Sequence, residues 1–170
     1  MKSGFFISVL LSFFVISCNS GSDTALSETA SQDYDFWVTL EEAQDKAYDE
    51  GKYIVLDVYT EWCGFCRRMN QETYGDEGVQ ENLDRYFYPV RINAESDREV
   101  TFLGETYTME SLALQFGVGS YPTTIFIAPN GEPIAVQPGF IDAPTFRRML
   151  SFVGSESYNT VSFEEYSNSN

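Results

Sequence analysis

The sequence predicts one α/β domain in which helices cover both faces of a mixed central β-sheet. Three observations support this fold class. Segments with helical patterns alternate along the chain with strand-like segments, as in sheets with helical layers. Residues 52–59 form an apolar run with little alternation, which indicates a central strand buried on both faces. The dipeptide Asn130–Gly131 marks a tight turn between two further strand-like segments and indicates an antiparallel pair.

The first half of the domain contains a clear helix start and a clear helix stop. Thr39, with a glutamate three residues later, is typical of a helix N-terminus, and Gly51 ends that helix after about Glu50. The buried strand at residues 52–59 follows. Beyond it we expect helices at residues 63–74 and 77–86, the first closed by Gly75, and then a strand at residues 87–93.

The second half continues the alternation. Residues 95–108 are polar and irregular, and we expect a loop or a small hairpin. Pro133 lacks an N–H group and therefore stands at a strand start or on a sheet edge. The expected elements are a helix at residues 108–117, strands at 123–128 and 133–137, and a helix at 142–153 capped by Asp142. Residues 155–170 form the expected C-terminal tail, which is mostly polar but has aromatic residues that can pack on the domain.

Composition excludes several classes of function. The chain of 170 residues is 43% hydrophobic and 16% aromatic, which indicates a folded domain. Its formal net charge is −16 and it has no basic stripe, which argues against a nucleic-acid partner. It has no histidine, so the commonest general base and the commonest zinc ligand are both missing.

The N-terminus has the pattern of an export signal. Lys2 is followed by an apolar stretch, residues 4–16, shorter than the ~20 residues that span a bilayer. Residues 15–18 (VISC) resemble the lipobox of bacterial lipoproteins, which implies cleavage after residue 17 and a lipid on Cys18. Residues 18–34 are then a flexible tether and residues 35–154 the domain. An uncleaved anchor, or a secretory signal with a chance cysteine, is the alternative.

The pattern that carries chemistry is Cys63-Gly64-Phe65-Cys66, which follows the buried strand and opens a helix. Thiol–disulfide exchange needs a thiolate, and a helix N-terminus favours an anion through its dipole and unpaired N–H groups. Two intervening residues place the second sulfur one turn along, within reach of the first. We therefore expect Cys63 to be the nucleophile and Cys66 to resolve the mixed disulfide. Half a zinc site or two inert core thiols are the alternatives.

Two segments resemble the hallmarks of thioredoxins. Residues 57–66 (DVYTEWCGFC) resemble the active-site strand and turn, and residues 117–124 (GVGSYPTT) resemble the loop whose cis proline lies opposite the cysteines. The similarity covers about residues 39–153, and it is greatest to the exported, lipoprotein-type branch. It implies a thioredoxin fold with an extra N-terminal helix, and a redox-active disulfide with no further cofactor and no metal.

The resemblance also assigns roles to an acidic and a cationic residue near the cysteines. Asp57 matches a buried acid, its pKa raised by desolvation, that moves the proton of Cys66 through water. Arg91 matches the position where thioredoxins keep a lysine near that acid. The alternatives are an aspartate with a purely structural hydrogen bond and an arginine solvated at the strand edge.

The resemblance places a substrate-binding surface around the disulfide. Pro122 is expected to be cis, so that the backbone of Tyr121 can pair with an extended substrate segment, unless it is an ordinary trans proline before a strand. Arg67 and Arg68 add positive charge near the thiolate, unless they only form a solvated helix face. The expected substrate-binding residues are Trp62, Gly64, Phe65, Tyr121 and Pro122.

The sequence therefore predicts a thiol–disulfide oxidoreductase. Its expected setting is the bacterial cell envelope, where a monomer held by the lipid on Cys18 faces the periplasm and reduces or isomerises protein disulfides with electrons from a membrane donor. Asn19 after the lipidated cysteine favours the outer membrane. Because Gly64-Phe65 brings no histidine, we expect a moderately reducing couple. A binding module with a structural disulfide and a disulfide-forming oxidase are the alternatives.

Overall fold

The computed structural model describes Met1 and residues 34–169. The predicted signal peptide, the lipid site at Cys18 and nearly all of the predicted tether lie outside the described residues. Among the described residues, no helix is long and apolar enough to cross a membrane.

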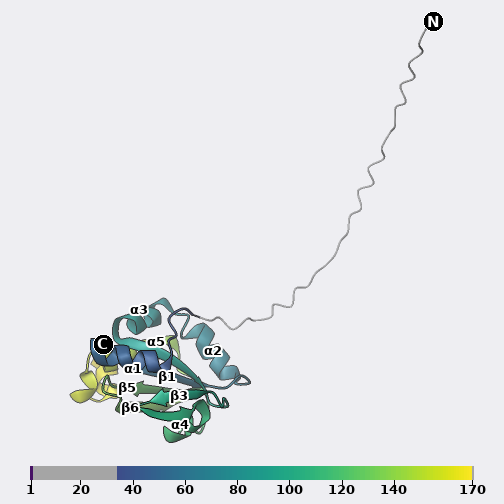
Figure 1. The fold of residues 1–170 in the computed structure, drawn as a ribbon. Coiled ribbons are helices and arrows are strands. Elements are labelled where there is room, and N and C mark those ends of the chain that lie inside the picture. The colour runs from purple at the N-terminus through teal and green to yellow at the C-terminus, as the bar shows by residue number, and fades with distance from the viewer. Residues whose placement is uncertain (2–33, 170) are drawn as a thin grey trace.

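A mixed four-stranded sheet forms the centre of the domain, in the order β2-β1-β5-β6 (Figure 1). Strand β1 runs parallel to β2 and antiparallel to β5, and β5 pairs antiparallel with β6. Residues 95–108, for which the sequence predicts a loop or a small hairpin, contain a two-stranded antiparallel hairpin. The strands are β1 (Tyr53–Tyr59), β2 (Phe87–Asn93), β3 (Glu99–Phe102), β4 (Glu105–Thr108), β5 (Thr123–Ile127) and β6 (Pro133–Pro138).

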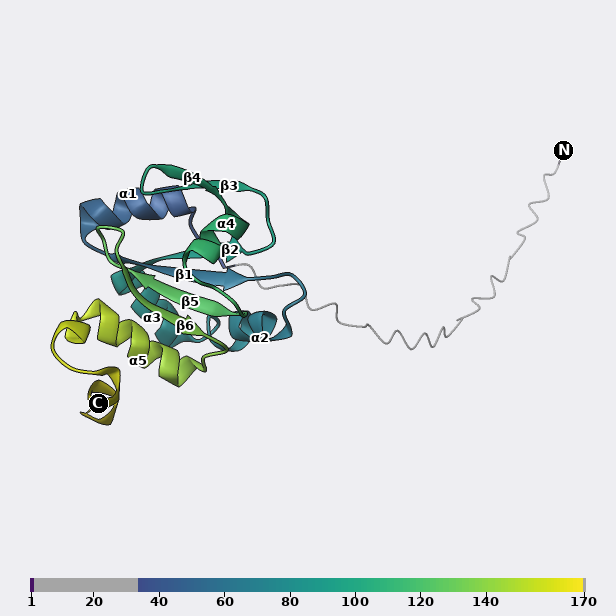
Figure 2. The same ribbon diagram turned by 90° about the horizontal axis from the view of Figure 1, so that it is seen from below.

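Helices cover both faces of the sheet, which confirms the predicted fold class (Figure 2). One face packs against α1 (Leu40–Glu50), α4 (Met109–Gln115) and the hairpin; its core includes Ile54, Leu56 and Val58. The other face packs against α2 (Gly64–Glu72), α3 (Glu77–Tyr86) and α5 (Ala143–Gly154); its core includes Val55, Met69 and Phe126. Alternate residues of β1 therefore enter opposite cores, as expected for a central strand.

The helix boundaries follow the predicted caps. The Thr39 hydroxyl accepts the Glu42 N–H at 3.2 Å, and Gly51 ends α1 with φ of 70°. Asp142 caps α5 through the N–H of Thr145 at 2.9 Å. Helix α2 ends at Glu72, slightly earlier than predicted, because the Tyr74 N–H bonds to the carbonyl of Met69, five residues back.

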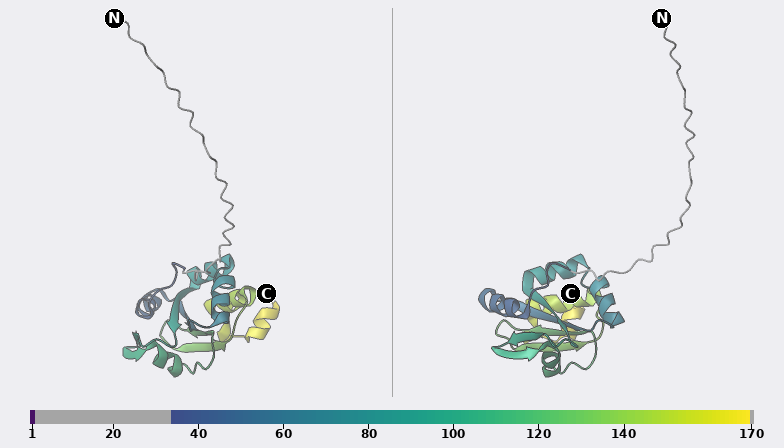
Figure 3. Two further views of the ribbon diagram at one scale, coloured as in Figure 1. Left: turned by 90° about the vertical axis from the view of Figure 1, so that its right-hand side faces the viewer. Right: turned by 45° about the vertical axis from the view of Figure 1, so that its right-hand side comes forward.

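The C-terminal segment is more ordered than a polar tail. It contains a 3₁₀ turn (Ser157–Asn159) and a further helix, α6 (Phe163–Ser169), which packs beside α5 (Figure 3). Two aromatic residues of α6 contact Phe152 of α5, with ring centroids at 5.4 Å for Phe163 and 5.2 Å for Tyr166. These contacts give the short helix an apolar face to bury.

Candidate active site

Cys63 and Cys66 form a disulfide at the junction of β1 and α2. Cys63 is the N-cap residue of α2, and its sulfur accepts the N–H of Cys66 at 3.0 Å. Both residues are almost fully covered, with 4% and 3% exposure. The sulfur of Cys63 thus lies where the helix dipole and the donated N–H of Cys66 favour a negative charge, which stabilises a thiolate after reduction.

Two exposed aromatic rings stand beside the buried disulfide. Trp62 is 65% exposed and Phe65 is 60% exposed, although both are large apolar side chains. The indole of Trp62 meets the ring of Tyr121 edge-on at 6.0 Å and donates its N–H to Glu95 at 2.9 Å. The ring of Phe65 lies 6.4 Å from that of Phe140. This arrangement is an apolar surface around a reactive bond, suited to docking a polypeptide.

The Tyr121–Pro122 peptide bond is cis, as the sequence predicted. Pro122 precedes β5, and the register pairs Thr123 with Val58 near the end of β1 that leads to the cysteines. The Pro122 carbonyl accepts the N–H of Gly139 at 2.8 Å, and the Thr123 hydroxyl donates to the Ser120 carbonyl at 2.7 Å. The proline loop is thereby fixed at the same end of the sheet as the disulfide.

Asp57 is a buried acid on β1, with 2% exposure. It is two residues from Val55, which packs in the core that includes Met69 of α2, so it faces the same helical layer as Cys66. Its Oδ2 accepts the Nε–H of Arg91 at 3.1 Å. Burial raises the pKa of Asp57, and the Arg91 charge and hydrogen bond oppose that shift only in part.

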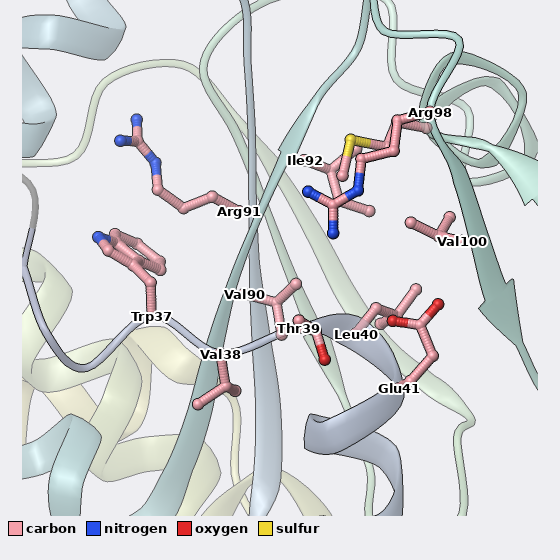
Figure 4. A pocket seen from close by; sticks show the side chains of 11 residues that line it. Trp37, Val38, Thr39, Leu40, Glu41, Val90, Arg91, Ile92, Arg98 and Val100 are labelled. Atoms are coloured by element: carbon pink, nitrogen blue, oxygen red, sulfur yellow. The ribbon is translucent and has the colours of Figure 1, made fainter.

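Arg91 is a partner of this acid and not a solvated edge cation. It lies opposite Asp57 in the β1–β2 register, and its side chain is 19% exposed. Its guanidinium lies 4.2 Å from the ring centroid of Tyr59 and 5.1 Å from that of Trp37, beside which Figure 4 shows it. Trp37 is a site neighbour that the sequence did not reveal.

The other predicted site residues lie on the first turns of α2. Arg67 donates to the Glu61 carbonyl at 2.9 Å, and among the described residues it has no ion-pair partner. Arg68 pairs with Glu72 at 2.9 Å and stacks over Phe140 at 4.5 Å. Arg67 therefore contributes net positive charge next to the disulfide, whereas Arg68 is largely neutralised.

Position 64 has room for a larger side chain than that of glycine, because a Cβ there would meet only Arg67, at an ordinary contact distance of 3.8 Å. Across residues 34–169 there is no group of three or more potential metal-binding His, Cys, Asp or Glu side chains.

The sequence model of the thioredoxin-like domain matches residues 40–154, most of the chain. The chain belongs to the thioredoxin-like family. The Cys63–Cys66 disulfide lies within the residues that this family model matches.

Known proteins agree with this assignment. The chain is 29% identical over 151 residues to the thiol:disulfide interchange protein DsbD of Citrobacter koseri; the match covers 84% of this chain and 25% of the relative. The chain thus spans about a quarter of that longer protein. A thioredoxin from Thermus thermophilus has a TM-score of 0.56 at 25% identity, covering 69% of this chain and 85% of its own.

A thioredoxin-fold protein from Helicobacter pylori has a TM-score of 0.64 at 19% identity, covering 71% of this chain and 88% of its own. At this identity the likeness supports the fold alone.

Proposed function

We propose that this thioredoxin-like oxidoreductase reduces or isomerises disulfides of exported proteins, using Cys63 as nucleophile and Cys66 as resolving thiol. The observation that carries the proposal is the Cys63–Cys66 disulfide at the N-terminus of α2, with the buried acid Asp57 behind it. The similarity to DsbD, by name a thiol:disulfide interchange protein, supports the same chemistry.

Reduction takes two exchanges that together move two electrons. The Cys63 thiolate attacks one sulfur of the substrate disulfide, which breaks that bond and releases the other sulfur as a thiolate. Cys66 then passes its proton through water to the Asp57 carboxylate and attacks the Cys63 sulfur. The second substrate sulfur leaves, and the Cys63–Cys66 disulfide forms. The substrate is then reduced, and the Cys63/Cys66 dithiol is oxidised to a disulfide. A membrane partner that carries a dithiol reduces this disulfide again.

Isomerisation uses the first exchange alone. Another substrate cysteine attacks the mixed disulfide, so that a different substrate disulfide forms and Cys63 leaves as a thiolate. No net electrons move. Both reactions need a substrate segment held over Cys63. We assign this holding to the backbone of Tyr121 before Pro122 and to the exposed rings of Trp62 and Phe65.

Two further features support the direction and the setting. The dipeptide Gly64-Phe65 and the absence of histidine favour a moderately reducing couple. The VISC segment at residues 15–18 supports lipid attachment at Cys18, which would place the domain on the periplasmic side of a membrane, with the outer membrane favoured by Asn19. Labelled palmitate should enter the wild-type protein in a bacterial host, and Cys18→Ser should abolish the label.

Insulin reduction tests the reaction, and a trap tests the nucleophile. With dithiothreitol as reductant, the wild-type protein should accelerate precipitation of the insulin B chain, and Cys63→Ser should not. Cys66→Ser should accumulate mixed disulfides with envelope proteins, whereas the double variant Cys63→Ser/Cys66→Ser should accumulate none. Absence of both turnover and mixed disulfides at Cys63 would contradict the proposal.

A further inference from the structure

Two hydroxyl groups are buried beneath the redox site without a hydrogen-bond partner. Tyr74 and Thr124 are both 0% exposed. Neither the phenol oxygen of Tyr74 nor the Oγ1 of Thr124 bonds to any residue in the described part of the chain. A buried hydroxyl without a partner is costly, and native structures usually satisfy such groups with protein atoms or with buried water.

Both hydroxyls are neighbours of Asp57. The β1–β5 register sets Thr124 directly opposite Asp57, so their side chains share one face of the sheet. Burial raises the pKa of the Tyr74 phenol, and the negative charge of Asp57 raises it further, whereas the Arg91 charge and the nearby Thr124 hydroxyl lower it. Three polar side chains, from β1, from β5 and from the segment just after α2, are therefore neighbours in one buried layer.

The carboxyl of Asp57 has an oxygen available at this point. Its Oδ2 accepts the hydrogen bond of Arg91. Its Oδ1 makes no hydrogen bond to any of residues 34–169, although the side chain is buried. A single water molecule can bond to Oδ1 and to both hydroxyls, and three hydrogen bonds are typical of buried waters.

The position of Tyr74 is fixed by its surroundings. Its N–H bonds to the Met69 carbonyl at 3.0 Å, and its ring lies edge-on to Trp37 at 4.8 Å and to Phe146 at 5.4 Å. With the ring held on two sides, the phenol oxygen stays near the Thr124 hydroxyl. A group held in this way can orient a water without an ordering cost at each reaction cycle.

We propose that Tyr74 and Thr124 are positioning residues of the redox site, whose two hydroxyls hold one water molecule against Oδ1 of Asp57. The role of this water as the carrier of the Cys66 proton rests on the proposed function. The hydroxyls move no electrons and touch no substrate; they place the water and, through it, stabilise the ionised form of Asp57.

The groups that act on Asp57 come from every neighbouring element. Arg91 lies on β2, Tyr59 on β1 itself, Thr124 on β5 and Tyr74 in the segment just after α2. Among these, Arg91 is the only one charged near neutral pH, and its ion pair with Asp57 involves neither Tyr74 nor Thr124.

The test measures the titration of the Asp57 carboxyl carbon by ¹³C NMR in the oxidised protein, assigned with Asp57→Asn. Tyr74→Phe and Thr124→Val each remove one hydroxyl with little change in shape. Each should raise the Asp57 midpoint by up to about one pH unit, because the carboxylate loses part of a hydrogen bond. Thr124→Ser keeps the hydroxyl and should titrate as wild type does.

Tyr53→Phe is the matched control. It removes the hydroxyl of a buried tyrosine on β1, the strand that carries Asp57. Because Tyr53 lies four residues and about 13 Å from Asp57, the titration midpoint of Asp57 should stay unchanged. The proposal is overturned if Tyr74→Phe moves the midpoint no further than Tyr53→Phe, or if Thr124→Ser shifts it as Thr124→Val does. Because the readout needs no substrate, failure of the proposed function would leave this result unaffected.

Discussion

Replacing Asp57 by asparagine should stabilise the protein near neutral pH and not in acid. The carboxyl is 2% exposed, and burial raises its pKa more strongly than Arg91 lowers it. A carboxyl whose pKa is higher in the folded than in the unfolded chain binds its proton more tightly when folded. Its contribution to stability is fully present below the unfolded pKa of about 4 and is lost as the pH rises through the folded pKa.

The size of the effect follows from the pKa displacement. Each unit by which folding raises the pKa corresponds to about 1.4 kcal/mol, so the gap between Asp57→Asn and wild type should widen at about that rate per pH unit above pH 4. The gap should become constant once the pH exceeds the folded pKa. In a protein of this size, each kcal/mol corresponds to about 2–4 °C in Tm.

Urea unfolding of the oxidised proteins from pH 3 to pH 9 measures this gap. Asparagine keeps an oxygen that can accept from Arg91, so the substitution removes the charge and leaves the contact. Glu61→Gln, an exposed acid near the site, is a control that should show no such trend. If the ion pair with Arg91 dominated instead, the sign would reverse: Asp57→Asn would destabilise the protein at pH 7, which would refute the assignment of burial as the main cause.

Three other substitutions test separate parts of the structure. Arg91→Met should raise the titration midpoint of Asp57 further, because the opposing cation is gone. Arg91→Lys keeps a positive charge and should raise that midpoint less; NMR titration of the carboxyl checks both. Phe140→Ala should raise the KM for insulin several-fold with kcat nearly unchanged, because it removes docking surface beside Phe65 and no reacting group. Steady-state kinetics measure both constants, and a fall in kcat alone would contradict this prediction. Thr39→Ala should lower the free energy of unfolding by about 1 kcal/mol through loss of the α1 cap, with no change in redox kinetics; an unchanged urea midpoint would contradict the capping role.

Local patterns were sufficient for most of the fold. Caps such as Thr39 and Asp142, and the apolar run of β1, depend on neighbours in the sequence, so they could be recognised without the structure. The helix α6 also had a local signal that the sequence interpretation missed. Ser162 accepts the N–H of Glu165 at 3.2 Å, and Glu165 accepts the N–H of Ser162 at 2.9 Å, which is a capping box.

The surroundings of the acid could not be predicted in the same way. Trp37 meets Arg91, and Tyr74 is a neighbour of Thr124 and is influenced by the charge of Asp57, across separations that no local pattern encodes. Placing them requires the strand register and the early end of α2, which turns Tyr74 inward. The resemblance to thioredoxins supplied Asp57 and Arg91, and the structure shows their side chains 3.1 Å apart.

The reduction potential of the Cys63–Cys66 couple tests the central claim most directly. Equilibration with glutathione buffers, followed by alkylation of free thiols, gives the potential without choosing a substrate. A redox-active couple that reduces or isomerises protein disulfides should lie between about −300 and −180 mV. A value well below about −300 mV would identify a structural disulfide, and a value near −120 mV would identify a disulfide-forming oxidase; either would contradict the account.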